Sequence, residues 1–374
     1  MLTGLESSIL KIIVENEGIS RQQIAQKLGI TKPVVSNVVA QLMDKGLVVE
    51  SGKTKIQNGR PRVRLSFVKN AWYCVGLELD ENFFEVVVSD LLGNVVDSME
   101  ERIPSYRNFD QLVDWCCKKA NEVLSRNFIF KDKLLGVGIG IAGMVDPKTG
   151  MVRTAPAFGI KNVDVASMFA QRLNANVIVM NRVRAAAFTE CRIGIAKGLE
   201  KAVFVFFDSG LGSALLIDGK FYEGFFGKAG EFGWLITDPF KKSEEIFHEP
   251  NFGYLARKIS GHGFKELSKK LGTNIEEIFS QDRGMLKEIL DKGLKHLAIA
   301  LANVLLIFDP QAVIIKGRLG QKYFDRITKV IVPTLKDFLP EQFYENLDIR
   351  CGIVEKFDVA LGAAFMVRQK VMNI

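Results

Sequence analysis

The sequence has no long hydrophobic run, no secretory signal pattern and no metal-spaced cysteines. Its longest apolar stretch, residues 297–308, is too short to cross a bilayer and is expected to form a buried helix. The N-terminus lacks the charged and then apolar arrangement of a signal peptide. The five cysteines are odd in number and scattered, which indicates a reducing compartment. These absences predict a cytoplasmic protein that does not enter a membrane.

Net charge is scarce over most of the chain. The 374 residues carry a formal charge of +7, and residues 1–70 account for +6 of it, with eleven Lys or Arg against five Asp or Glu. A basic surface confined to one small region is typical of a domain that contacts nucleic-acid phosphates. The length predicts two or three domains.

A helix-turn-helix pattern follows the first helix, which is predicted over residues 5–16. Ser20 is a suitable N-cap, Gly29 can end the helix in a left-handed conformation, and Thr31 can cap the next helix. That second helix would lie in a DNA major groove. Its apolar face is predicted to consist of Val34, Val35, Val38, Val39, Leu42 and Met43.

Two strand-like segments, 47–50 and 63–67, flank a basic loop and complete a winged helix-turn-helix domain over residues 1–70. Pro61 holds the backbone extended, so that Arg60 and Arg62 can enter a minor groove. The residues expected to contact base edges are Thr31, Ser36 and Asn37, and those expected to contact phosphates are Lys32, Lys53, Lys55 and Arg64. The alternative is a small helical module with a solvated charged loop.

From residue 72 onwards the pattern is that of a larger α/β protein. A strand–turn–strand unit ahead of helices occurs twice, which predicts a duplicated fold with a cleft between its halves. Strands are predicted at 73–79, 83–90, 134–142, 201–207, 214–217 and 312–315, and helices at 110–126, 251–270 and 284–308.

Several short motifs in this part resemble the ROK family of repressors, open reading frames and sugar kinases. They are Thr154-Ala155-Pro156, Met180-Asn181, Gly212, Ala229-Gly230-Glu231-Phe232-Gly233 and Leu361-Gly362-Ala363-Ala364. The chain is most similar to the family's winged-helix branch, which includes xylose and N-acetylglucosamine repressors. The resemblance implies a two-lobed, actin-like (ribonuclease H-like) ATPase-type fold and a homodimer. The first lobe would span residues 71–190 together with a C-terminal helix at 362–374, and the second lobe residues 191–361.

The groups that the family's kinases use are damaged here. The first phosphate loop corresponds to residues 78–82, where carboxylates replace the glycines that approach a phosphate. The second loop survives only in part, as Ser209, Gly210 and Gly212, after Asp208 in place of its first glycine. The family's general base corresponds to Arg182, which cannot accept a proton at neutral pH. The resemblance therefore implies no catalytic residue and no ATP.

The family's zinc ligands are replaced as well. Trp234 stands where the family has histidine, and Phe247, Glu249 and Tyr254 stand where it has cysteines. No tetrahedral set of sulfur and nitrogen ligands can be assembled from these side chains. The sequence therefore predicts no metal site.

The family's sugar ligands are partly kept, as Asn181 and Glu231, beside Arg182 and Trp234, which differ. These four are the candidates for binding an effector, with Trp234 offering an apolar face to a sugar ring. Arg182 is expected to pair with Glu231, because an unpaired buried charge is costly. The alternative is that the retained pair is only inherited scaffold.

The sequence thus predicts a DNA-binding transcriptional regulator, a repressor of carbohydrate-utilisation genes that binds double-stranded operator DNA and a small sugar effector. The alternative is an ATP-dependent hexose or N-acetylhexosamine kinase, against which the damaged groups argue. A regulator that has lost effector binding is a third possibility.

Overall fold

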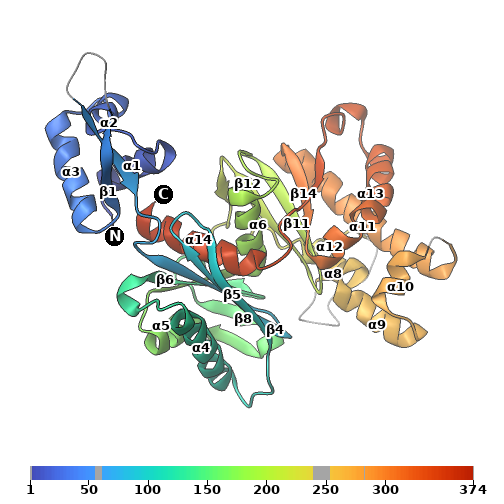
Figure 1. Ribbon diagram of the computed structural model, residues 1–374. Helices are drawn as coiled ribbons and strands as arrows, with labels where there is room; N and C mark the ends of the chain where they lie inside the picture. Colours follow the sequence, from blue (N-terminus) through green and yellow to red (C-terminus); the bar gives the residue numbers. More distant parts are fainter. Residues whose placement is uncertain (1, 55–60, 239–252, 282, 374) are drawn as a thin grey trace. The chain divides into compact units, whose positions relative to one another are not determined.

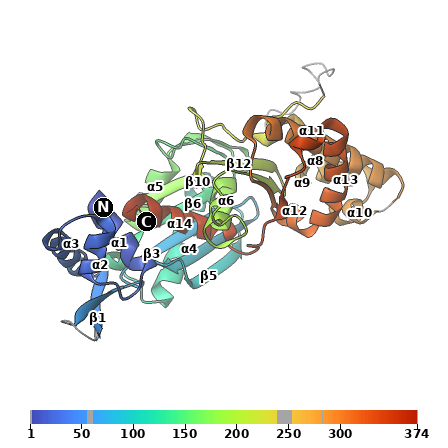
Figure 2. The same ribbon diagram turned by 90° about the horizontal axis from the view of Figure 1, so that it is seen from above.

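The computed structural model describes residues 2–54, 61–238, 253–281 and 283–373 (Figures 1 and 2). It divides into two compact units. Unit one consists of Met1–Ile141, Asp164–Met180 and Ala360–Ile374, and unit two of Ala142–Val163 and Asn181–Val359. None of the described helices is long and apolar enough to cross a membrane.

Unit one begins with a winged helix, drawn in blue in Figure 1. Its elements are α1 (Gly4–Glu15), α2 (Arg21–Leu28), α3 (Lys32–Asp44), β1 (Val48–Thr54) and β2 (Arg62–Phe67). Ser20 and Gln23 form a capping box at the start of α2, and Gly29 ends that helix with φ 65°. β1 and β2 pair antiparallel from Val48–Phe67 to Thr54–Arg62. This confirms the predicted winged helix.

The rest of unit one is built on a five-stranded sheet in the order β10-β6-β3-β4-β5. β3 runs parallel to β6 and antiparallel to β4. The elements are β3 (Tyr73–Leu79), β4 (Phe83–Asp90), β5 (Val95–Arg102), α4 (Phe109–Arg126), β6 (Leu134–Ile141), α5 (Val165–Leu173), β10 (Val177–Asn181) and α14 (Asp358–Met372), with a 3-10 turn at Lys131–Lys133.

Helices cover both faces of this sheet. On one face the rings of Phe84 in β4 and Trp115 in α4 meet edge to face, with centroids 5.6 Å apart. On the other face α14 lies directly on the strands, because glycines replace side chains there. A Cβ on Gly76 would lie 1.7 Å from the carbonyl oxygen of Ala360, and one on Gly138 would lie 2.1 Å from that of Ala363.

The far end of α14 joins the core of the winged helix. Ser7 Oγ in α1 donates a buried hydrogen bond of 2.7 Å to the carbonyl oxygen of Met372. The shared hydrophobic cluster includes Leu10 of α1, Val39 of α3 and Val367 of α14. One continuous core therefore holds the winged helix on the first sheet.

Unit two contains a second five-stranded sheet, ordered β13-β12-β11-β14-β15, and a small antiparallel sheet β7-β8-β9. β11 runs parallel to β14 and antiparallel to β12. The strands are β7 (Met144–Val145), β8 (Val152–Ala155), β9 (Ile160–Val163), β11 (Ala202–Phe207), β12 (Leu211–Ile217), β13 (Lys220–Phe221), β14 (Ala312–Lys316) and β15 (Ile349–Cys351).

The helices of unit two pack mainly around β11 and β14, where Phe207, Leu297 and Ile331 are buried in one cluster. These helices are α6 (Arg182–Ile193), α8 (Tyr254–Ile259), α9 (Gly261–Leu271), α10 (Ile275–Ser280), α11 (Met285–Phe308), α12 (Arg318–Lys322) and α13 (Phe324–Phe338), with 3-10 turns at Pro156–Phe158, Phe232–Trp234 and Glu341–Phe343. Two mixed sheets behind a winged helix confirm the predicted α/β class.

The single helix predicted around residues 251–270 is wrong, because two helices meet there. Ser260 ends α8, and its Oγ accepts a 3.2 Å hydrogen bond from the amide of Gly263 in the first turn of α9. A buried serine that caps a new helix offers the backbone an alternative to continuing the old one.

Candidate DNA-reading surface and effector site

The outward side of α3 carries polar side chains that the rest of the described chain does not use. Thr31 and Asn37 are exposed and Ser36 is half-buried. Thr31 caps α3 by position, but its side chain makes no capping bond. Side-chain hydrogen bonds are likewise absent from Ser36 and Asn37 among the described residues. In α2, by contrast, Ser20 Oγ donates to Gln23 Oε1 over 2.7 Å.

Val34 corrects the predicted apolar face of α3. Its side chain is 40% exposed, whereas Val35 and Val39 are fully buried. At about 100° per residue, Val34 points roughly 90° away from the centre of the buried face. It lies on the same side of the helix as Asn37 and Gln41. Gln41 is exposed and was not among the residues predicted to contact DNA.

Two of the predicted DNA-contacting residues of the wing, Lys55 and Arg60, lie outside the described residues. Lys53 is exposed and Arg62 is half-buried. The Arg64 guanidinium lies over the turn between α1 and α2, since a Cβ on Gly18 would be 2.5 Å from Arg64 Nη2. Lys32, at the start of α3, is also exposed.

Asn181 lies at the junction of β10 and α6, where both polar atoms of its side chain form hydrogen bonds. Its Oδ1 accepts a 2.8 Å hydrogen bond from the amide of Val183 and so caps α6. Its Nδ2 donates to the carbonyl oxygen of Gly143 over 2.9 Å. Both ends of the amide therefore hold the backbone in place. This agrees with the alternative hypothesis that Asn181 is retained for the scaffold and not for binding an effector.

Arg182 follows it as the first residue of α6 and is buried against Phe206 and Asp208. Its guanidinium lies 5.3 Å from the Phe206 ring centroid and 3.8 Å from Asp208 Oδ2. Arg318 Nε approaches the same carboxylate at 3.3 Å. The predicted ion pair between Arg182 and Glu231 is wrong, because Glu231 forms no ion pair with any described residue.

The charge that acts on Glu231 comes from Arg184 instead. Burial raises the pKa of the Glu231 carboxyl above its ordinary value, and the positive charge of Arg184 partly opposes that shift. Arg184 donates to the carbonyl oxygen of Gly227 over 3.0 Å and lies 3.2 Å from Glu223 Oε1. Three residues beyond Glu231, the indole of Trp234 is 40% exposed. A carboxyl without an ion pair among the described residues thus precedes, by three residues, an accessible aromatic side chain.

The second phosphate loop carries an acidic side chain at its start. The Asp208 carboxylate, 6% exposed, stands in the turn before Ser209 and Gly210, where it would repel a phosphate. Gly212 serves packing, since a Cβ there would lie 2.8 Å from Val183 Cγ2 of α6. No described position fits zinc either, because Trp234 and Tyr254 offer no metal ligand. Phe247 and Glu249 lie outside the described residues.

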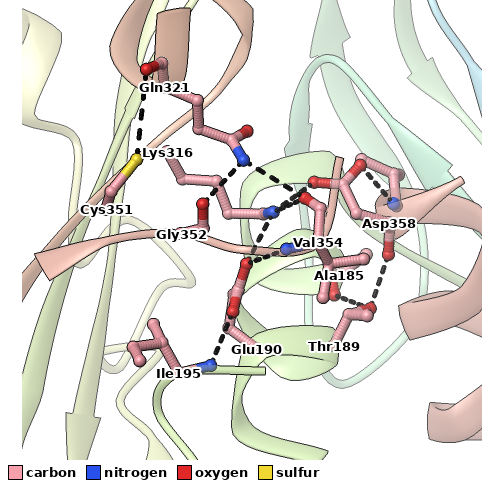
Figure 3. Close-up of polar contacts among 11 residues, drawn as sticks. Ala185, Thr189, Glu190, Ile195, Lys316, Gln321, Cys351, Gly352, Val354 and Asp358 are labelled. Carbon is pink, nitrogen blue, oxygen red and sulfur yellow. Dashed lines mark hydrogen bonds and ion pairs between the residues drawn. The ribbon is translucent and has the colours of Figure 1, made fainter. Parts of the chain in front are cut away.

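A buried ion cluster lies at the other end of α6 (Figure 3), and no pattern in the sequence predicted it. Lys316 Nζ lies 2.9 Å from Glu190 Oε1 and 2.9 Å from Asp358 Oδ2. Glu190 also accepts 2.9 Å hydrogen bonds from the amides of Ile195 and Val354. A lysine at the end of the apolar strand 312–316 could have drawn attention, but its partners lie 126 residues before and 42 residues after it.

A family model described as the ROK family matches residues 74–370, and one described as the MarR family matches residues 2–55. The chain is 28% identical over 389 residues to a xylose repressor of Caldicellulosiruptor bescii, with 96% of this chain and 94% of that protein covered. It is 21% identical over 387 residues to the DNA-binding transcriptional dual regulator NagC of Escherichia coli K12, with 98% of this chain and 93% of that protein covered.

Among solved structures, the chain is similar to a ROK family transcriptional regulator described as a homolog of the E. coli MLC protein. The TM-score is 0.83 at 19% identity, with 99% of this chain and 96% of that chain covered. At this identity the likeness shows the fold, from the winged helix to the second unit.

Proposed function

The chain belongs to the ROK family and is a DNA-binding transcriptional repressor of sugar-utilisation genes; on that premise we propose which surfaces carry out the function. Thr31, Ser36 and Asn37 of α3 read base edges in the major groove of operator DNA. Lys32 and the basic residues of the wing neutralise phosphates, which makes the affinity depend on salt. Unit two binds a sugar effector beside Glu231 and Trp234.

The observation that carries the proposal is the contrast between neighbouring helices of the winged helix. Ser20 and Gln23 at the start of α2 bond to one another, whereas Thr31, Ser36 and Asn37 of the next helix have no side-chain bond among the described residues. Unsatisfied donors and acceptors on an exposed helix are available to base edges at no cost of a broken internal bond. Their place on the second helix of a helix-turn-helix supports that use.

The effector site rests on Glu231 and Trp234 more than on Asn181. Glu231 has no ion pair among the described residues, and Trp234, three residues further along the chain, is 40% exposed; a carboxyl and an indole are side chains that suit sugar hydroxyls and the apolar face of a pyranose. Asn181 already bonds at both ends of its amide, so it supports the site by holding α6.

The described residues at the family's catalytic positions do not support phosphotransfer. Arg182 occupies the general-base position and is held by Asp208, and Asp208 itself stands in the phosphate loop. We therefore propose that the ROK fold acts here as an effector receptor without ATP or zinc.

A homodimer completes the proposal, because one recognition helix covers only one half-site. Two copies related by a two-fold axis would read a roughly palindromic operator. Binding of the sugar would change the spacing of the two recognition helices and release the DNA.

Selection of bound duplexes from a random pool, followed by titration of the enriched sequence, tests the proposal. We expect a palindromic sequence, and we expect Asn37→Ala to bind it roughly 10-fold more weakly. Gln22→Ala, an exposed polar change on α2, serves as the matched control and should bind like the original chain. Addition of D-xylose, D-glucose or N-acetyl-D-glucosamine to the complex then tests release. Failure to enrich any sequence would overturn the assignment.

A further inference from the structure

Val34 of α3 is a large apolar side chain that the protein's own core does not use. It is 40% exposed, and it lies outside the hydrophobic cluster that contains Val35, Val38 and Val39. Those three valines are at most 9% exposed. The burial that explains the other valines of this helix therefore does not explain Val34.

Helix formation does not explain Val34 either. A β-branched side chain loses rotamer freedom against the preceding turn, so an exposed helix position favours Ala, Lys or Glu. Val34 also follows Pro33 in the first turn, where the chain gains nothing from a branched residue. A contact with a molecule outside the chain would give this side chain a use.

The surroundings of Val34 indicate what that contact is. Asn37 and Gln41 follow at spacings of three and four on the same side of α3, and both are exposed. Their side chains form no hydrogen bond to another described residue. Lys32 adds a positive charge at the start of the helix. Val34 thus lies within a stripe of free polar groups on the helix that is proposed to enter the major groove.

Among the groups that base pairs present in the major groove, the 5-methyl of thymine is the apolar one. We propose that Val34 recognises the 5-methyl group of one operator thymine in each half-site, beside the base pair that Asn37 contacts. This inference rests on the proposed function of α3 as the recognition helix. The thymine 5-methyl group is the feature of a base pair that an aliphatic side chain at this position can distinguish.

Replacement of single thymines by deoxyuridine tests the contact, because deoxyuridine lacks only the methyl group. In the operator enriched by the full-length protein, each thymine is replaced in turn, and affinity is measured for the original chain and for Val34→Ala. We expect one position per half-site at which the original chain loses affinity roughly three- to tenfold. Val34→Ala should bind the thymine operator more weakly by a similar factor and be indifferent to deoxyuridine at that position.

Val49→Ala is the matched control, because Val49 is a 46% exposed valine on β1. It should keep the full sensitivity to deoxyuridine. Val34→Ala replaces an exposed residue with a better helix former, so its thermal transition should lie at or slightly above that of the original chain.

Two results would overturn the inference while leaving the proposed function intact: an original chain that ignores deoxyuridine at every position, or a Val34→Ala variant with unchanged sensitivity. In both cases Asn37→Ala would still weaken operator binding. Failure to enrich any operator would instead overturn the proposed function and this inference with it.

Discussion

The ammonium group of Lys316 lies 2.9 Å from the Glu190 carboxylate, and both side chains are withdrawn from solvent. Lys316 ends β14, Glu190 lies in α6, and Asp358 at the start of α14 completes the cluster (Figure 3). Buried charges of this kind are stable only while each one keeps its partners. The cluster therefore ties three distant segments of unit two to one another.

Loss of the lysine charge should destabilise the protein strongly. We expect Lys316→Met to lower the free energy of unfolding by about 3–5 kcal/mol, because it leaves two carboxylates buried without a cation. Urea denaturation measures the change. Lys322→Met is the control, since the ion pair of Lys322 with Glu276 is largely exposed and should contribute no more than about 1 kcal/mol. Equal losses in the two variants would show that the buried cluster does not stabilise unit two.

The bond between Ser7 and Met372 should hold the winged helix on α14. Ser7→Ala removes a buried donor and leaves the Met372 carbonyl without it, which we expect to cost about 1–3 kcal/mol. The adjacent Ser8→Ala removes an exposed bond to Gly4 within α1 and should change stability by less than about 0.5 kcal/mol. Thermal unfolding of both variants decides the matter. A loss no larger in Ser7→Ala than in Ser8→Ala would contradict the shared core.

The carboxyl of Glu231 should make stability depend on pH in a defined direction. Because burial raises its pKa, the folded protein binds this proton more tightly than the unfolded chain does. The stabilising contribution of the protonated form is fully present below the ordinary value of 4.5 and is lost as pH rises through the raised pKa. We expect Glu231→Gln to match the original chain near pH 4 and to unfold at a higher temperature near pH 8. A difference that stays constant with pH would contradict this account.

Restoration of the family's catalytic carboxylate should not create a kinase. Arg182→Asp would remove the guanidinium that lies 3.8 Å from Asp208 and add a second carboxylate to the same buried region. Because a partner of Asp208 is lost and a like charge is gained, we expect a lower melting temperature and no ADP formation from ATP with any hexose. A coupled ADP assay measures the turnover. Arg182→Met, which removes the charge without adding one, is the control for stability, and turnover by Arg182→Asp would mean that the phosphate loop still works.

The sequence predicted well the features that depend on local signals. Caps at Ser20 and Gly29 and the strand-like segments of the wing are read from neighbouring residues, and the winged helix follows from them. The α/β class likewise follows from repeated apolar segments. The family motifs place an altered phosphate loop at Asp208 and the general-base position at Arg182, and these two assignments stay predictions.

Side-chain direction and long-range pairing could not be predicted in this way. Val34 resembles its neighbouring valines in composition, and only the helix geometry turns it outwards. Arg182 was expected to pair with Glu231, but its guanidinium lies 3.8 Å from the carboxylate of Asp208, in the turn after β11. The partners of Lys316 are separated by long stretches of chain, so no local pattern connects them.

We propose that the ROK fold of this chain serves a DNA reader and does not transfer phosphate. Fluorescence anisotropy of the selected operator, recorded with the sugars of the release test and with ADP formation followed in the same sample, tests it most directly. The account predicts salt-sensitive operator binding that at least one sugar reverses, while ADP stays at the level of a blank. Sugar-dependent ADP formation at an ordinary kinase rate, without operator binding at low salt, would contradict it.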